Sequence, residues 1–551
     1  MRLNGADIIA EVLLEQGVDT VFGYPGGAVL NIYDALYKYS DRISHYMTAH
    51  EQGAAHAADG YARSTGKTGV VIATSGPGAT NLVTGIATAY MDSVPMVAIT
   101  GNVATSLIGR DSFQEVYIAG ITMPITKHNF VVRDVSELAD TLREAFRIAA
   151  SDRPGPVLVD VPKDVTANMA EYIPAVPVST EYKEELPDLT EAAEIINNAK
   201  RPVIYFGGGV RISGAGHSLL ALMKKAGIPG THTLMAAGVL RYDEPLNLGL
   251  IGMHGRKSAN LAVDNADVVI AAGTRFSDRV ALKPDKFAER AKIIQIDIDF
   301  SEMDKNVECD LNLKGDVEQI LSALIPMIEE KDRSDWHEEI KSWRVKDYGA
   351  PRTDDSLTPA YVLDTASVLA GEDAIYVTDV GQHQMWAAQY LHHVDADRFL
   401  TSGGLGTMGY GYGAAIGAAV ANPDRRVVHI TGDGSFHMNL NEACTAVSYK
   451  LPIITVIMNN AVLGMVRQWQ KAFYGKRYSS SEPERVTDYA KVAEGFGAIG
   501  YKCTTPAEFK TAFEKALEAD GPVWIECVID REERVLPMIP AGGTVDDTIS
   551  E

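Results

Sequence analysis

Short, mainly apolar runs recur along the whole chain, separated by longer segments in which apolar residues repeat at helical spacing. Runs with the length of buried strands stand at 70–73, 95–99, 157–160, 268–271 and 427–430. Runs that stay apolar, instead of alternating with polar residues, are typical of parallel sheets covered by helices on both faces. The alternation of such strands with helices therefore predicts an α/β fold.

The same pattern divides the chain into three blocks. Residues 175–187, which contain several Pro and Glu residues, are interpreted as a linker, and the charged, weakly periodic residues 329–358 as a second linker with some helix. We therefore expect three consecutive domains, each a mostly parallel sheet flanked by helices. Their expected bounds are 1–174, 188–330 and 359–551.

Size and charge narrow the class of protein. At 551 residues the chain exceeds what one hydrophobic core usually supports. The formal charge of -23 disfavours nucleic acid or an anionic membrane as the main partner, because both attract basic surfaces. The four cysteines form no CxxC pair, which argues against a zinc site and for a reducing compartment. The N-terminus lacks the apolar region of a secretory signal and no apolar run is long enough to span a membrane, so we expect a cytoplasmic protein.

Two polar motifs follow neighbouring predicted strands in the third block. Gly432-Asp433-Gly434-Ser435 comes after the run 427–430, and Asn460 comes after the run 452–457, with a predicted helix at 439–449 between them. A right-handed crossover places two such strands side by side and parallel, with their carboxyl ends at the same edge of the sheet. The side chains of Asp433 and Asn460 are therefore expected to lie close together.

These side chains could hold a metal ion. A carboxylate, a carboxamide and a nearby backbone carbonyl would leave a small octahedral cation in need of phosphate oxygens, which suits Mg²⁺ bound to a diphosphate. The helix start after Ser435 would add amide donors. Either motif alone is more often an ordinary turn or strand end. The pair at this spacing favours a metal–diphosphate site.

A carboxylate also opens a predicted Ala-rich helix in the first block, where Glu51 stands in Ala49-His50-Glu51-Gln52-Gly53. On composition alone, an acid that complements the helix dipole is the commoner explanation. Elsewhere, Gly404-Leu405-Gly406-Thr407-Met408-Gly409 matches the G-x-G-x-x-G fingerprint of dinucleotide-binding proteins. We do not interpret it as one, because no convincing strand-to-helix turn leads through it.

The Gly432–Ser435 motif, paired with Asn459-Asn460, resembles the signature of the thiamine diphosphate-dependent enzymes. That resemblance implies that Glu51 lies beside the pyrimidine N1′ and keeps it protonated, so that the 4′-amino group can remove the thiazolium C2 proton. It implies that Met408 wedges the cofactor into its bent shape. It also implies at least a homodimer, because the pyrimidine binds the first domain of one subunit and the diphosphate binds the third domain of its neighbour.

Further motifs resemble the catalytic subunit of the acetohydroxyacid synthases nearly end to end. They are Tyr24-Pro25-Gly26-Gly27-Ala28, Phe113-Gln114-Glu115, Val161-Pro162-Lys163-Asp164-Val165, Gly252-Met253-His254-Gly255, Arg275-Phe276-Ser277-Asp278-Arg279 and Gly464-Met465-Val466-Arg467-Gln468-Trp469-Gln470. The resemblance implies that pyruvate is decarboxylated on thiamine diphosphate and that the hydroxyethyl unit is condensed with a second 2-keto acid.

The expected products are 2-acetolactate, or 2-aceto-2-hydroxybutyrate from 2-ketobutyrate, in the first common step of branched-chain amino acid synthesis. The resemblance also implies Mg²⁺, an FAD that takes part in no net electron transfer, and a separate small regulatory subunit.

For Arg279 and Trp469, the role that the family resemblance implies differs from the role that such residues have more often. The planar guanidinium of Arg279 suits the carboxylate of the second keto acid, although surface ion pairs are more frequent. Trp469 shares a helix face with Met465, four residues earlier, and such a stripe is usually core. The resemblance implies instead that Trp469 lines the acceptor pocket and favours 2-ketobutyrate by ~1–3 kcal/mol. Its apolar neighbours would be Met253, Phe113 and Met465.

The resemblance assigns roles residue by residue. The catalytic positions are Glu51, Phe113, Gln114, Lys163, Met253, Arg279 and Trp469. The metal ligands are Asp433, Asn460 and the backbone carbonyl of Val462. Thiamine diphosphate would contact Tyr24, Gly26, Gly27, Glu51, Val380, Gly381, Gln382, His383, Gly406, Met408, Gly432, Asp433, Gly434, Ser435, Asn460, Gly464 and Met465. FAD would contact Arg153, Gly207, Gly208, Thr233, Leu234, Met253, His254, Gly273, Arg275, Asp297, Asp316, Gln384 and Met385.

One motif departs from the family pattern. Ser277 stands where the usual Arg-Phe-Asp-Asp-Arg has its first aspartate, but a hydroxyl can still hydrogen-bond, so FAD remains expected. Within the superfamily the alternatives are a catabolic acetolactate synthase, a pyruvate oxidase or a 2-keto acid decarboxylase. From another class, a non-catalytic flavoprotein scaffold would predict loss of Glu51, Asp433 or Asn460, and all three are present.

Overall fold

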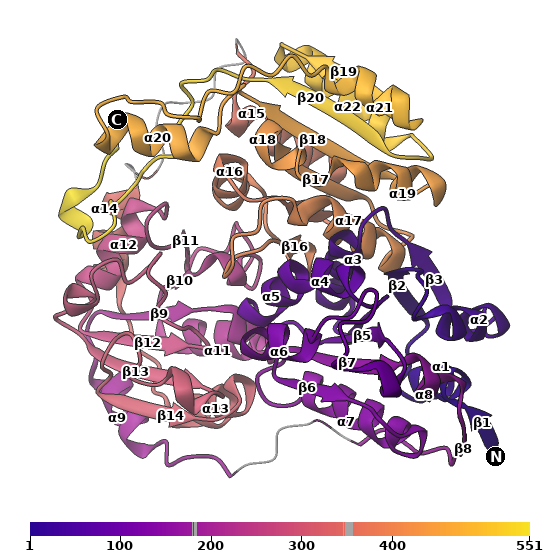
Figure 1. Ribbon diagram of the computed structural model, residues 1–551. Coiled ribbons are helices and arrows are strands. Elements are labelled where there is room, and N and C mark those ends of the chain that lie inside the picture. The colour runs from indigo at the N-terminus through magenta and orange to yellow at the C-terminus, as the bar shows by residue number, and fades with distance from the viewer. Residues whose placement is uncertain (179, 181–184, 345–346, 348–355, 551) are drawn as a thin grey trace.

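The chain folds into three six-stranded sheets in the computed structural model, which describes residues 1–178, 180, 185–344, 347 and 356–550 (Figure 1). Every ladder in these three sheets is parallel, and the strands alternate with helices along the chain. The α/β class with three mostly parallel sheets is confirmed. The expected domain bounds stay a prediction, and parts of both expected linkers, 181–184 and 348–355, lie outside the described residues.

The first sheet has the strand order β3-β2-β4-β5-β7-β6. Its strands are β2 (Thr20–Tyr24), β3 (Ser44–Met47), β4 (Gly69–Ala73), β5 (Met96–Asn102), β6 (His128–Val131) and β7 (Pro156–Pro162). The helices of this block are α1 (Gly5–Glu15), α2 (Leu30–Lys38), α3 (Glu51–Thr65), α4 (Pro77–Asn81), α5 (Val83–Met91), α6 (Ile118–Thr122), α7 (Leu138–Ala150) and α8 (Lys163–Ala167). A short antiparallel pair, β1 (Arg2–Asn4) with β8 (Met169–Glu171), closes the block.

The second sheet has the order β11-β10-β9-β12-β13-β14. Its strands are β9 (Pro202–Phe206), β10 (Gly230–His232), β11 (Asn247–Leu250), β12 (Val268–Ala272), β13 (Lys292–Asp297) and β14 (Leu311–Lys314). Its helices are α9 (Thr190–Asn198), α10 (Gly208–Ile212), α11 (Gly216–Ala226), α12 (Lys257–Asp264) and α13 (Val317–Leu324). The stretch interpreted as a second linker contains α14 (Ser334–Arg344).

The third sheet has the order β16-β15-β17-β18-β20-β19. Its strands are β15 (Ile375–Thr378), β16 (Phe399–Leu400), β17 (Val427–Gly432), β18 (Ile453–Asn459), β19 (Ile499–Cys503) and β20 (Val523–Val528). Its helices are α15 (Pro359–Ala370), α16 (Gln382–Tyr390), α17 (Tyr410–Ala421), α18 (Asp433–Phe436), α19 (Ala443–Ser448), α20 (Gly464–Phe473), α21 (Tyr489–Phe496) and α22 (Pro506–Leu517).

The helix predicted at 439–449 is wrong at its N-terminal end, where a 3-10 turn, Leu440–Glu442, precedes α19. Contacts with distant segments hold this stretch out of helical geometry. Asn439 Nδ2 donates to the Gly409 carbonyl at 3.0 Å. The Glu442 carboxylate accepts hydrogen bonds from the backbone amides of Ala49 and His50, both at 3.1 Å. Because these partners lie far away in the sequence, local periodicity carries no sign of them.

Helices α3 and α17 join the first and third blocks (Figure 1). Both helices are rich in Gly and Ala where they meet, and one hydrophobic core contains residues of both sheets, such as Phe22 and Ile375. A Cβ atom added to Gly60 would overlap the Ala414 carbonyl, and one added to Gly417 would overlap the Ala57 carbonyl. The two backbones therefore lie closer than any larger side chain would allow.

Gly417→Ala is expected to weaken this junction, because overpacking a close contact costs ~1–3 kcal/mol. The measurement is the thermal unfolding midpoint, which should fall relative to that of the unaltered chain. Gly495→Ala is the matched control, since a Cβ there meets no atom within 4 Å and alanine favours the helix α21. Equal midpoints for the two variants would contradict the close packing of α3 on α17.

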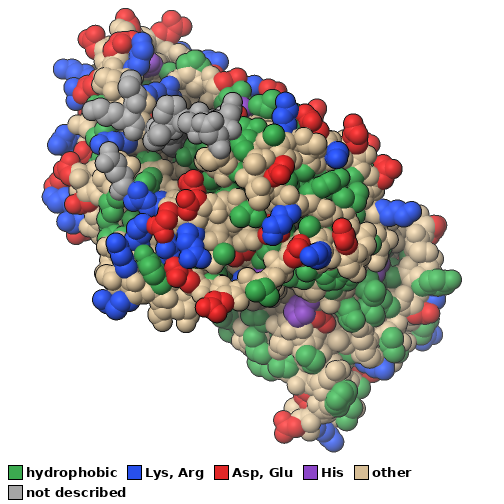
Figure 2. Space-filling model, turned by 90° about the horizontal axis from the view of Figure 1, so that it is seen from above, with side chains coloured by type: hydrophobic (Ala, Val, Ile, Leu, Met, Phe, Trp, Pro, Cys, Tyr) green, Lys and Arg blue, Asp and Glu red, His purple; other side chains and the backbone are tan. Residues whose placement is uncertain are grey.

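The surface carries charges of both signs. On the face shown in Figure 2, acidic and basic side chains are interspersed with apolar ones, so the net charge of -23 is not gathered there into one acidic patch. Within the described residues, no helix combines the length and the apolar character needed to cross a membrane.

Candidate active site

The Gly-Asp-Gly motif and Asn460 lie at the carboxyl ends of paired strands. β17 and β18 are direct neighbours, with Gly432 opposite Met458. Asp433 and Asn460 are both buried, and the Asn460 backbone amide hydrogen-bonds the Asp433 carboxyl. Burial raises the pKa of Asp433 to about 6, so the site favours a cation that compensates its charge.

Gln382 and His383, at the start of α16, face this pair. Asn460 Nδ2 donates to Gln382 Oε1 at 3.0 Å, which turns the carboxamide oxygen of Asn460 away from Gln382. A Cβ atom on Gly464 would overlap Gln382 Oε1, and one on Gly432 would lie 2.7 Å from His383 Nδ1. The strand ends and the helix start therefore form a compact cradle that only glycine permits at these positions.

The cradle suits a magnesium–diphosphate group. His383 is buried, its burial lowers its pKa to about 4, and its Nε2 has no hydrogen-bond partner among the described residues. Such an orphaned buried atom is typical of a ligand site. Within the described part of the chain, no three His, Cys, Asp or Glu side chains form a metal cluster. An ion at Asp433 and Asn460 would therefore take its other ligands from backbone carbonyls and phosphate.

Glu51 begins α3 and is 9% exposed. Its Oε2 accepts a hydrogen bond from Asn81 Nδ2 at 2.9 Å, and a Cβ on Gly78 would lie 3.1 Å from its Oε1. Thr74 connects this carboxylate to the Tyr24–Gly27 loop, because Gly26 and Gly78 both pack against its side chain. Gly26, which is expected to contact thiamine diphosphate, is thus linked to Glu51 through Thr74.

The other expected catalytic residues of the first block lie near the surface. Gln114 has a φ of 58° and packs against Gly76, two residues before Gly78. Phe113 is 87% exposed, and Lys163, which begins α8, is exposed as well. Both side chains therefore lie at the open surface of the single chain.

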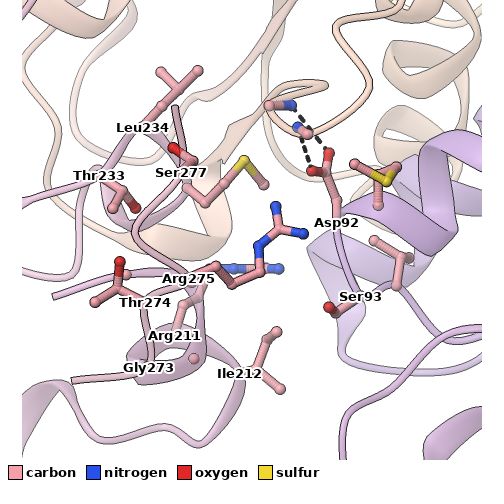
Figure 3. A pocket seen from close by; sticks show the side chains of 18 of the residues that line it. Asp92, Ser93, Arg211, Ile212, Thr233, Leu234, Gly273, Thr274, Arg275 and Ser277 are labelled. Carbon is pink, nitrogen blue, oxygen red and sulfur yellow. Dashed lines mark hydrogen bonds between the residues drawn. The ribbon is translucent and has the colours of Figure 1, made fainter. Parts of the chain in front are cut away.

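A cavity of about 1560 Å³ lies between the second block and its two neighbours. In Figure 3, Thr233, Leu234, Gly273 and Arg275 lie on one side, and Asp92 lies on the other. Every position expected to contact FAD lines this cavity: Arg153, Gly207, Gly208, Thr233, Leu234, Met253, His254, Gly273, Arg275, Asp297, Asp316, Gln384 and Met385. Ser277, the position that departs from the family pattern, lines it too.

The cavity walls fit a polar, flavin-sized ligand. The buried atoms Thr233 Oγ1 and His254 Nδ1 have no hydrogen-bond partner in the described structure. Burial raises the pKa of Asp297 to about 6, and a neighbouring hydroxyl donor would relieve that cost. Gly273, with a φ of 56°, lets the β12 end approach Gly209 closely. These features suit the hydroxyls and phosphates of a dinucleotide.

The same cavity brings together residues expected at the acceptor site. Arg279, Met253, Met465 and Trp469 all line it, as do Val380, Gly381 and Gly406. Arg279 forms the surface ion pair that the sequence left open, with Asp278 at 3.7 Å, while its Nη1 lies 3.7 Å from Met253 Sδ. Trp469 is half-buried at the cavity instead of packed in the core. Glu51, Phe113, Gln114, Lys163, Asp433 and Asn460 do not line it.

Comparison with known proteins places the chain in a family. Three sequence families described as thiamine pyrophosphate enzyme domains match it: the N-terminal TPP binding domain at 3–121, the central domain at 189–324 and the C-terminal TPP binding domain at 379–527. The chain is 46% identical to a probable acetolactate synthase large subunit of Methanocaldococcus jannaschii, over 99% of this chain and 95% of that one. It is 43% identical to the Escherichia coli acetolactate synthase isozyme 2 large subunit, over the full length of both.

The chain belongs to the acetolactate synthase large subunits. The resemblance stated from the sequence is thereby confirmed, and so is the assignment to the thiamine diphosphate-dependent enzymes. Roles of single residues in this acetolactate synthase family member are not tested by the comparison, and they stay predictions.

Several charged residues at the cavity of this acetolactate synthase family member are absent from the sequence-based prediction, among them Arg63, Asp92 and Arg211. Arg63 and Asp92 come from the first block, and Arg211 follows the glycine-rich turn after β9. Arg211 Nη1 lies 3.2 Å from Asp397 Oδ1. The glycine-rich turn at 207–209, just before Arg211, was the available signal, because glycines after a strand let the backbone approach a phosphate closely. Asp92 has no comparable local signal.

Proposed function

We propose that the chain is an acetohydroxyacid synthase, which decarboxylates pyruvate and condenses the two-carbon unit with a second 2-keto acid. The product is 2-acetolactate, or 2-aceto-2-hydroxybutyrate when the acceptor is 2-ketobutyrate. Support comes chiefly from one cavity in which the expected acceptor residues Arg279, Met253 and Trp469 adjoin the expected flavin positions. Near full-length identity to acetolactate synthase large subunits supports the same activity.

Bound thiamine diphosphate would supply the electron sink for decarboxylation. Glu51, oriented by Asn81, would hold the proton at N1′ of the pyrimidine. The side-chain oxygens of Asp433 and Asn460, with the Val462 carbonyl, would hold Mg²⁺ and through it the diphosphate. The apolar walls near Met465 and Trp469 would exclude water from the reacting carbons.

The guanidinium of Arg279 would orient the acceptor's carboxylate. Arg279 is 67% exposed at its side chain, and its exposed partner Asp278 is a weak competitor, because surface ion pairs contribute little. A planar guanidinium can bind a carboxylate through two parallel hydrogen bonds. FAD in the same cavity would act as a structural element, because carboligation transfers no net electrons.

The active site is proposed to form between two copies of the chain. Within one chain, Glu51 and its neighbours Thr74 and Gly78 do not line the cavity that contains the expected acceptor residues. The segment that carries Phe113 and Gln114 also exposes large apolar side chains: Leu107 44%, Phe113 87%, Tyr117 70%, Ile121 42% and Met123 64%. A second copy would cover this surface and bring Phe113 to a neighbouring site.

A small regulatory subunit is proposed as a further partner, because the relatives are named large subunits. We also propose that the protein acts in the cytoplasm, in branched-chain amino acid synthesis.

The product formed from pyruvate tests the proposed reaction. A carboligase releases 2-acetolactate, whereas a decarboxylase releases acetaldehyde and an oxidase releases peroxide. Acetolactate as the main product would support the proposal, and either of the other two would contradict it. A catabolic acetolactate synthase would form acetolactate without needing FAD.

Trp469→Leu is expected to lower the preference for 2-ketobutyrate over pyruvate as acceptor by about tenfold, because one methylene against a fitted apolar wall contributes ~1–3 kcal/mol. The measurement is the product ratio when both keto acids compete. Tyr474→Leu is the matched control, since Tyr474 is an aromatic residue at the end of the same helix that does not line the cavity. An unchanged ratio in Trp469→Leu would contradict the role of Trp469.

A further inference from the structure

A glycine-rich segment, 401–409, links β16 to α17 and borders the cavity. Residues 402–406 line the cavity directly, and Met408, the expected wedge under thiamine diphosphate, follows two positions later. Gly403, Gly404, Gly406 and Gly409 give this segment little intrinsic order, because glycine loses more conformational freedom on folding than other residues. Some other part of the protein must hold it in one shape.

Asp92, just after α5, contacts this segment from the first block. Its buried carboxylate accepts hydrogen bonds from the amides of Gly403 at 3.1 Å and Gly404 at 2.7 Å, which Figure 3 shows as dashed lines. A Cβ on Gly404 would lie 2.8 Å from Asp92 Oδ1 and 2.8 Å from the Met91 carbonyl. The segment therefore rests directly on the end of α5.

Arg63 forms hydrogen bonds with both Asp92 and segment 401–409. Its Nη2 lies 2.9 Å from Asp92 Oδ2, and its Nη1 donates to the Thr401 carbonyl at 3.0 Å. Its Nε donates to Asp59 Oδ1 at 2.6 Å. All three charged side chains are almost fully buried, so each hydrogen bond between them is strong and costly to lose.

The other side of the segment contacts residues expected to bind both cofactors. Gln384, an expected FAD contact, donates to Thr401 Oγ1 at 2.7 Å and to the Ser402 carbonyl at 3.1 Å. The Gly409 amide donates to the hydroxyl of Ser435, an expected diphosphate contact, at 3.2 Å. One segment thus lies between the proposed flavin and thiamine diphosphate sites.

We propose that Asp92 is a positioning residue that pre-orders segment 401–409 for both cofactors. This inference rests on the proposed function, since it concerns where FAD and thiamine diphosphate bind. With Asp92 in place, each cofactor meets a segment already in the binding shape. Without it, whichever cofactor binds first must order the segment, and the second then binds more tightly.

Asp92→Asn tests this account, because asparagine keeps the shape but places an amide donor against an amide or a guanidinium. The measurement is the dissociation constant of FAD, followed by flavin fluorescence, with and without saturating thiamine diphosphate and Mg²⁺. In Asp92→Asn, FAD alone should bind at least about tenfold more weakly, because hydrogen bonds to a buried charged group are lost. Thiamine diphosphate should then restore most of the lost affinity, whereas in the unaltered chain it should change FAD affinity by less than about threefold.

Asp397→Asn is the charge control, because it removes the same charge from the same cavity without touching the segment. It should show no dependence of FAD affinity on thiamine diphosphate beyond that of the unaltered chain. Gly404→Ala tests the segment without a charge change and should behave like Asp92→Asn, while Gly495→Ala, in open space, should behave like the unaltered chain.

Unchanged FAD affinity in Asp92→Asn would overturn the inference. So would a loss of FAD affinity that thiamine diphosphate does not restore, because Asp92 would then act on the flavin site alone. If the unaltered chain bound neither cofactor, the proposed function itself would fail, and this inference with it.

Discussion

Glu51→Gln is expected to lower the rate of acetolactate formation by about 100- to 10,000-fold, the range that positioned acid–base groups contribute. Glutamine has the shape of glutamate and can still accept the hydrogen bond from Asn81, so the fold around α3 should persist. It cannot supply the negative charge that keeps the pyrimidine N1′ protonated. The measurement is kcat for acetolactate from pyruvate at saturating thiamine diphosphate.

Glu137→Gln is the matched control, since Glu137 is an exposed acid of the same block. Its rate should equal that of the unaltered chain. A rate for Glu51→Gln within about threefold of the control would contradict the assignment of Glu51, because loss of acid–base catalysis is far larger.

Asp433→Asn is expected to weaken Mg²⁺-dependent binding of thiamine diphosphate by about 10- to 150-fold. A carboxylate contact to the ion should contribute at least as much as a hydrogen bond to a charged group, ~1.5–3 kcal/mol. Calorimetric titration with thiamine diphosphate at several Mg²⁺ concentrations measures the effect. Asp520→Asn, an exposed position in the same block, is the control and should bind normally.

Co-expression of the Glu51→Gln and Asp433→Asn chains separates a site between subunits from a site within one chain. If Glu51 of one copy serves the Asp433 cradle of its partner, a mixed dimer contains one intact site, and activity returns. If both residues serve one site in the same chain, every site stays defective. Persistent inactivity of the mixture would contradict the proposed dimeric site.

The strands were predictable because the sheets are parallel and buried on both faces. β5 and β7 are buried at every position, and each begins with a continuous apolar run, Met96–Ile99 and Pro156–Val159. The proximity of Asp433 and Asn460 was also predictable from the sequence, because crossover connections obey a general rule of handedness. The strands were predictable from local sequence alone, and the proximity of the two side chains from one topological rule.

Features that depend on distant contacts were not predictable in this way. Glu442 turns toward the amides of Ala49 and His50 in another block, and the predicted helix therefore starts too early. Asp92 is an ordinary acid in the sequence, and only the fold brings it to Gly403 and Gly404. The exposed apolar surface around Phe113, proposed to contact a second copy of the chain, likewise leaves no local pattern in the sequence.

The most direct test of the proposed reaction is acetolactate formation from pyruvate by the purified chain, with thiamine diphosphate, Mg²⁺ and FAD omitted one at a time. We predict acetolactate with all three present, loss of activity when any one is omitted, and no peroxide under any condition. Acetaldehyde or peroxide as the main product, or full activity without FAD, would contradict the account.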